Sequence, residues 1–83
     1  KNMSQLKYEV NAFWDKKAQV WVAESESVPG LATEAETLET LTQKLRTLVP
    51  ELLQLNRVIE DTSVREIEIE ITSHRQETIQ IAT

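Results

Sequence analysis

Three glutamates on a two-residue spacing are the strongest candidates for chemistry in this sequence. Glu66, Glu68 and Glu70 alternate with isoleucines, and a two-residue period places all three on one face of a β-strand. Such a row could bind a divalent cation, supply an acid/base pair or meet a basic partner protein. Successive carboxylates would lie roughly 6.5–7 Å apart along the strand, and no further ligand is indicated. We interpret the row as a solvated sheet face or an acidic partner-binding patch, with catalysis the least favoured alternative.

Other residues suited to chemistry are scarce. His74 is the only histidine, falls in a predicted turn, and has no cysteine or second histidine with which to share a metal. The single glycine excludes a glycine-rich phosphate loop, and no serine stands in a nucleophile-elbow sequence. Trp14 and Trp21 are better suited to packing in the core or a hairpin than to an interface. The sequence therefore predicts no catalytic residue, no metal and no cofactor.

Length and charge narrow the choice of partner. A chain of 83 residues makes one domain whose small core predicts modest stability as a monomer, so a homo-oligomer, most simply a dimer, is expected. The net charge of −5 disfavours direct binding to nucleic acid and suits a basic protein, although it also serves ordinary solubility. These properties favour a protein partner.

Features that report on cellular location point to the cytoplasm. The absence of cysteine fits a reducing compartment. No apolar run approaches about 18 residues, and no charged-then-apolar leader opens the chain, so neither a membrane span nor a signal peptide is expected. Lys1 and Asn2 precede Met3, so residues 1–3 are expected to be disordered or left over from cloning.

A leucine run predicts the single helix that positions these groups. Six leucines recur at spacings of 3, 4, 3, 4 and 3, which is one helix face: Leu38, Leu41, Leu45, Leu48, Leu52 and Leu55. Thr37 is the expected N-cap and Asn56 the expected stop. Pro50 interrupts the hydrogen bonding without interrupting the leucine period, so we expect one kinked helix. This helix covers a sheet; a coiled-coil seam is the disfavoured alternative.

Alternating segments on either side of the helix predict the sheet. Strands are expected over 5–14 and 18–23 as a hairpin, then over the short segment 31–33 after the turn at Pro29-Gly30. Beyond the helix, 66–71 is a strand, 73–76 a turn, and Ile79 and Ile81 mark a last strand. The fold class is α+β, in the order β-β-β-α-β(-β), with an antiparallel or mixed sheet and one helix on one face. The last strand is either a blunted edge or a self-association edge formed by Ile79 and Ile81.

The stretch from Phe13 to Asn56 resembles the HicB-like antitoxin domain family, and within it a single-domain branch of unknown function. The matching features are Trp21-Val22-Ala23, Val28-Pro29-Gly30-Leu31, and the segment 33–38 that opens the helix. The resemblance implies a partial ribonuclease-H-like sheet with one helix, self-association, and masking of a small basic mRNA-cleaving toxin of the HicA type. The acidic metal-binding set of true ribonuclease H enzymes is not recognisable, so no catalytic residue is carried over.

Three hypotheses follow for residues 1–83, taken as one domain without a C-terminal DNA-binding domain because the chain ends in strands. The first is a non-enzymatic, cytoplasmic protein-binding domain that covers a basic ribonuclease toxin, with Glu66, Glu68 and Glu70 at the interface. The second is a stand-alone homo-oligomeric module of regulatory or unknown role without a toxin. The third is a metal-dependent hydrolase that uses the glutamate row.

Overall fold

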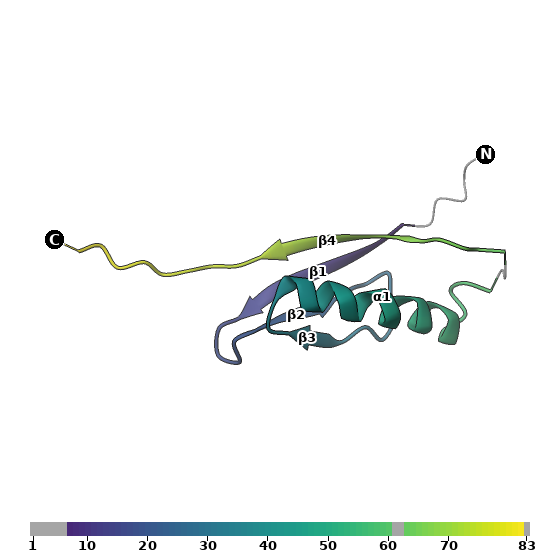
Figure 1. Cartoon of the computed structure of the whole chain (residues 1–83), viewed down its shortest axis with the longest axis horizontal. Helices are drawn as coiled ribbons and strands as arrows, with labels where there is room; N and C mark the ends of the chain where they lie inside the picture. Colours follow the sequence, from purple (N-terminus) through teal and green to yellow (C-terminus); the bar gives the residue numbers. More distant parts are fainter. Residues whose placement is uncertain (1–6, 61–62, 83) are drawn as a thin grey trace.

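The computed structural model describes residues 7–60 and 63–82, so the predictions for residues 1–3 and for a strand start at Gln5 lie outside the described residues. The elements follow the order β1 (Lys7–Asp15), β2 (Val20–Glu24), β3 (Thr33–Ala35), α1 (Leu38–Leu55) and β4 (Glu68–His74). One helix lies across one face of a four-stranded sheet (Figure 1). The predicted α+β class with the order β-β-β-α-β is confirmed. None of the described helical residues forms a segment long and apolar enough to cross a membrane.

The sheet is mixed, with strand order β3-β2-β1-β4. β1 and β2 form the expected antiparallel hairpin, in which Trp14 lies opposite Trp21 and Ala12 opposite Ala23. β4 returns after the helix and pairs with β1 in parallel, from Lys7 with Glu68 to Phe13 with His74. β1 and β2 are therefore the two central strands, and β3 and β4 are the two edges.

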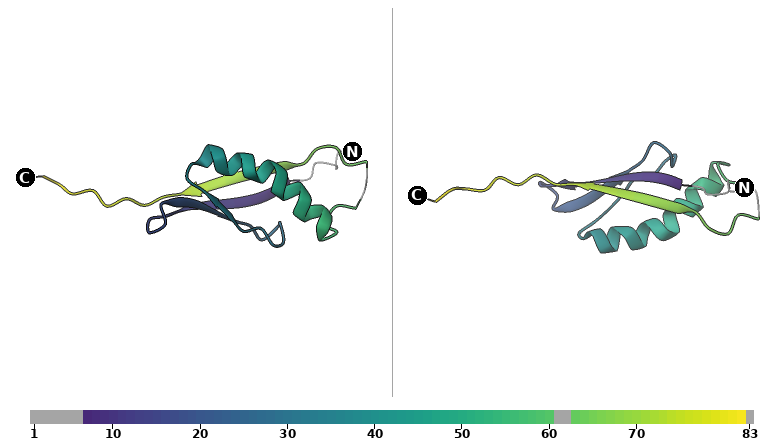
Figure 2. Two further views of the ribbon diagram at one scale, coloured as in Figure 1. Left: turned by 60° about the horizontal axis from the view of Figure 1, so that its bottom comes forward. Right: turned by 90° about the horizontal axis from the view of Figure 1, so that it is seen from above.

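The helix begins and ends where the sequence predicts. The Thr37 hydroxyl accepts the Thr40 amide at 3.0 Å, which caps the first turn, and Asn56 caps the last. The helix continues through Pro50, and Figure 2 (left) shows its axis bending along its length. The fully buried side chains are spaced by four residues, as Leu41, Leu45, Val49 and Leu53.

This buried row differs from the predicted leucine face. Leu48 and Leu52 are only partly buried and Leu55 is 76% exposed, because rows of residues four apart are inclined to the helix axis. Val49 and Leu53 thus occupy the buried positions that the leucine period assigned to Leu48 and Leu52.

The single loop between β2 and β3, residues 25–32, contains a tight turn and a set of serine hydrogen bonds. Gly30 has φ of +81°, and the Leu31 amide donates to the Val28 carbonyl at 3.2 Å, as the predicted Pro-Gly turn requires. The Ser25 hydroxyl donates to the Glu9 carbonyl and accepts the amides of Ser27 and Val28. Backbone pairing between β1 and β2 ends at Asn11 and Glu24, and the Ser25 hydroxyl extends the contact between the two segments to Glu9.

The region after the helix differs most from the prediction. β4 begins at Glu68 rather than at Glu66, and the segment 73–76 predicted to turn instead continues the strand through His74. Residues 75–82, called the arm below, form neither a strand nor a hairpin, so the predicted last strand is wrong within the described residues. The arm extends away from the domain in every view (Figures 1 and 2), and the molecule measures 61 × 25 × 19 Å.

The core lies between the helix and one half of the sheet. Val10, Ala12 and Ala23 are buried beneath the helix, which packs against β2 and β3. The core-face isoleucines at the β4 side are only partly buried: Ile67, Ile69 and Ile71. The helix therefore leaves the β4 margin of the apolar face half covered.

Candidate protein-binding face

The sheet face opposite the helix is acidic. The strand registers bring Glu9 beside Glu70, Lys7 beside Glu68, and Val22 beside Glu34, while Asn11 lies between Glu24 and Thr72. The acidic face, as we use the term, consists of five exposed carboxylates from all four strands: Glu9, Glu24, Glu34, Glu68 and Glu70. Because like charges directly opposite each other destabilise a sheet, this arrangement costs stability and suits a positively charged partner.

Lys7 is a cation that lies among these carboxylates on β1. Its Nζ lies 3.1 Å from Glu70 Oε1, and both side chains are 54% exposed. The hydrogen bond and charge of Glu70, aided by the charges of Glu68 and Glu9, raise the pKa of Lys7 above its ordinary value. Lys7 is therefore charged at neutral pH and cancels about one of the five negative charges, so the face stays acidic.

Apolar side chains share this face near the β1–β2 turn. Phe13 lies opposite Val22 and His74. Phe13, Val20 and Val22 are all half-buried, although α1 covers the other face of the sheet. A partly exposed aromatic beside carboxylates is a usual anchor in protein interfaces. The face thus combines an acidic half with a small apolar half.

The structure places two of the three predicted patch residues on this face. Glu68 and Glu70 point outward from β4, but Glu66 precedes the strand and lines a recess beside the helix with Pro50, Gln54 and Ile67. Glu66 therefore lies before the strand that carries Glu68 and Glu70, because the alternating sequence begins before the pairing with β1 does. Glu9, Glu24 and Glu34 were missed, since their place beside β4 depends on strand order and register.

The remaining predicted residues have simpler surroundings. His74 is exposed at the end of β4 rather than in a turn. Trp14 and Trp21 pack edge to face with centroids 5.4 Å apart, as the hairpin interpretation expected. Within residues 7–60 and 63–82, no three histidine, cysteine or acidic side chains are close enough to hold a metal ion.

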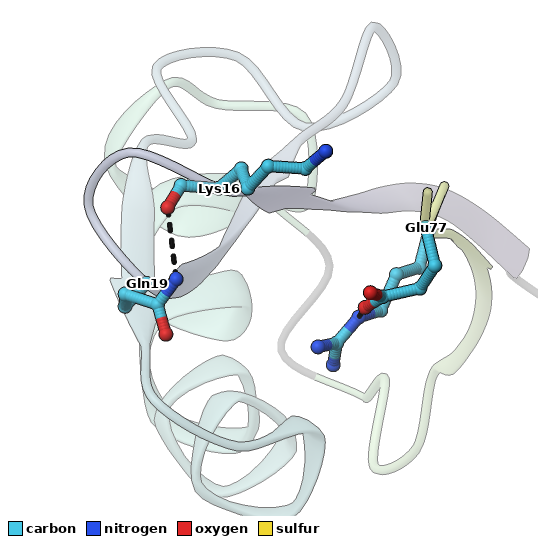
Figure 3. A network of polar contacts seen from close by, with 4 residues as sticks. Lys16, Gln19 and Glu77 are labelled. Atoms are coloured by element: carbon cyan, nitrogen blue, oxygen red, sulfur yellow. Dashed lines mark hydrogen bonds and ion pairs between the residues drawn. The ribbon is translucent and has the colours of Figure 1, made fainter. Parts of the chain in front are cut away.

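Arg75 holds the start of the arm against the domain. Its guanidinium lies 4.1 Å from the Trp14 ring centroid, and its Nε donates to Glu77 Oε2 at 2.7 Å. Figure 3 shows Glu77 together with the β1–β2 turn, in which Gln19 Nε2 donates to the Lys16 carbonyl at 2.9 Å. Arg75 and Glu77 are two residues apart, and side chains at this spacing lie on the same face of an extended backbone. Their contact therefore indicates that the start of the arm is extended.

Replacing Arg75 by alanine should expose Trp14. Loss of the guanidinium uncovers one ring face, so tryptophan emission should shift to longer wavelength and acrylamide quenching should increase. The effect on stability should be about 0.5–1 kcal/mol, as for an exposed cation–π contact. Arg46→Ala, on the exposed side of the helix, is the matched control. Unchanged quenching in Arg75→Ala would contradict the stacking.

Comparisons with known proteins give matches that extend over nearly the whole chain. Residues 7–81 match the sequence model of a protein family, DUF1902, which is described as a domain of unknown function. The chain belongs to this family. The crystal structure of a hypothetical protein from the extremely thermophilic bacterium Thermus thermophilus is similar, with a TM-score of 0.73 and 46% identity over 88% of this chain and 99% of that chain. No curated protein matches.

The DUF1902 match includes the arm. It begins at the first residue of β1 and ends at Ile81, so β4 and nearly all of the arm fall inside the region that defines the family. The arm is therefore part of the DUF1902 domain.

Proposed function

We propose that this DUF1902 domain is a non-enzymatic protein-binding module that masks a small basic mRNA-cleaving toxin of the HicA type, in the manner of HicB antitoxins. The observation that carries the proposal is the acidic face, on which five glutamates and one lysine are exposed across all four strands. A ribonuclease must bind phosphates and so presents a basic surface, to which this face is complementary. The resemblance of residues 13–56 to HicB-like domains supplies the class of partner.

The acidic half and the apolar half of the face would have different roles in binding. Exposed carboxylates steer a basic protein during diffusion and are screened by salt. Phe13 and Val22 offer apolar surface for the centre of the contact, where most binding energy arises. A toxin seated here would have its phosphate-binding residues covered by carboxylates, which excludes RNA by charge and by bulk.

Growth rescue is the direct test. A small basic protein encoded beside this chain should arrest growth when it is expressed alone, and co-expression of the DUF1902 domain should restore growth. Failure of rescue with every neighbouring basic protein would reject the toxin-masking role.

Charge reversal on β4 locates the interface. Glu68→Lys/Glu70→Lys should weaken toxin binding by about 10-fold or more and reduce its dependence on salt, because like charges then face each other. Glu51→Lys/Glu60→Lys, at two exposed positions outside the sheet, makes the same change in net charge and should have a much smaller effect. Isothermal titration at two salt concentrations measures both. Equal losses in the two variants would mean that net charge, not this face, governs binding.

Two alternatives predict different results. A homo-oligomeric module without a toxin would self-associate yet bind no basic neighbour, and the exposed arm is the observation that favours it. A hydrolase would bind a divalent cation, so calorimetry with Mg²⁺ or Mn²⁺ would give heat, whereas a protein-binding module should give none.

A further inference from the structure

The arm is the most exposed apolar segment of the described chain. Ile79 is 81% and Ile81 87% exposed, more than any other large hydrophobic side chain of the described residues. Apart from the contacts of Arg75 and Glu77, no hydrogen bond of the arm is found within residues 7–60 and 63–82. Two isoleucines on an extended, alternating segment are typical of a strand that pairs with another strand.

β4 presents the surface that such a strand needs. It is an edge of the sheet, and among the described residues it pairs only with β1, so the main-chain groups along its outer side are open. Ile69 and Ile71 are only partly buried on its core face, because the helix packs against β2 and β3. A strand added beside β4 would both complete its hydrogen bonds and cover these side chains.

We propose that the arm of one chain pairs, antiparallel, with the β4 edge of a second copy, and that the second copy's arm returns to the first. A two-fold axis perpendicular to the sheet relates the two copies and joins their four-stranded sheets into one continuous sheet. The proposal does not depend on toxin binding, since the acidic face is not used for pairing.

A second copy fits because each chain carries both halves of the contact. Residues 75–82 are about as long as the seven-residue β4, so donor and acceptor match in length. The other edge, β3, has three residues and offers too short a strand. The arm of each copy pairs with β4 of the other, so the same contact is made twice. Such a self-complementary contact is typical of two-fold symmetric dimers.

The faces of the arm match those of β4. Arg75 lies over Trp14 on the helix-covered side of the sheet, so the alternation places Ile79 and Ile81 on that side as well. In the register that sets Ile79 beside Ile71 of the second copy, Ile81 lies beside Ile69, and four isoleucines extend the core at each arm.

Charge on the opposite face also permits this pairing. There the arm carries Gln76, Thr78 and Gln80, which are polar but uncharged, and in the same register they lie beside His74, Thr72 and Glu70 of the second copy. No carboxylate of the arm meets Glu68 or Glu70, so the acidic strand edge does not repel it. The Arg75 contacts hold the start of the arm in line with β4 and reduce the entropy lost on pairing.

The mass of the full chain in solution tests the exchange. Light scattering should give twice the chain mass of 9.5 kDa at tens of micromolar. Ile79→Asn/Ile81→Asn should halve the measured mass while the helical signal in circular dichroism is kept, because both side chains lie outside the core of the single chain. Leu55→Asn, at a 76% exposed apolar residue outside the arm, should leave the mass doubled. A monomeric natural chain, or a dimer that survives the double substitution, would overturn the proposal.

Disulfide cross-linking tests the direction of pairing. The chain has no cysteine, so Thr72→Cys/Thr78→Cys introduces the only thiols, and oxidation should produce a covalent dimer. A link within one chain is excluded, because six extended residues span about 20 Å. Thr72→Cys/Gln54→Cys, with the second thiol on the exposed side of the helix, should remain monomeric under denaturing conditions. Absence of the cross-link in a dimeric sample would overturn the antiparallel register.

Discussion

Leu45→Ala should lower the free energy of unfolding by about 2–5 kcal/mol, enough to unfold much of a domain this small. Leu45 is fully buried at the middle of the helix, between Leu41 and Val49. Truncation there removes apolar burial and leaves a cavity that a two-layer domain has few residues to fill. Urea unfolding followed by circular dichroism measures the change.

Leu55 supplies the matched control for this substitution. It has the same side chain on the same helix but is 76% exposed, so Leu55→Ala should change the stability by no more than about 0.5 kcal/mol. Similar losses at the two positions would contradict the placement of the helix on the sheet. Unfolding should be followed at several protein concentrations, since a dimer becomes more stable as its concentration rises.

Pro50→Ala should raise the free energy of unfolding, by about 1–3 kcal/mol. The helix runs from Leu38 to Leu55, so Pro50 lies in its interior and cannot donate to the Arg46 carbonyl. Alanine restores that hydrogen bond and relieves the ring's clash with the preceding turn, which outweighs the greater freedom of the unfolded chain. Glu51→Ala, at the next and exposed position, is the control and should have a small effect.

A loss of stability in Pro50→Ala would identify a different role for the ring. Pro50 also borders the recess that contains Ile59 and Ile67. A destabilised variant would mean that packing of the ring in this recess contributes more than the missing hydrogen bond.

Local signals in the sequence were sufficient for the helix and the first hairpin. The Thr37 cap, the Asn56 stop and the turn at Gly30 depend on groups a few residues apart, and each is found where it was predicted. Pairing of β4 with β1 joins distant segments, and here the polar run 73–76 was wrongly interpreted as a turn. A turn needs a following strand that folds back, and the arm instead continues outward.

The candidate site could likewise be predicted only where it depends on local sequence. Alternation correctly placed Glu68 and Glu70 on one face, since the period of a strand is local. That Glu9 lies beside Glu70, with Glu24 and Glu34 on neighbouring strands, follows only from strand order and register. Glu66 lies outside β4 because its alternation with isoleucine continues beyond the part of the segment that pairs, and its role at an interface stays a prediction.

The parallel pairing of β1 with β4 sets the order in which the chain can fold. The residues of β1 from Lys7 to Phe13 each pair with a residue 61 positions later, whereas the contacts of the hairpin and the helix close much shorter loops. Because long loops are slow to close, β3, the hairpin and the helix should assemble first and β4 last. Until β4 pairs, β1, which is a central strand of the finished sheet, is an open edge. A ribosome that stalls before residue 68 would therefore release a chain prone to aggregation.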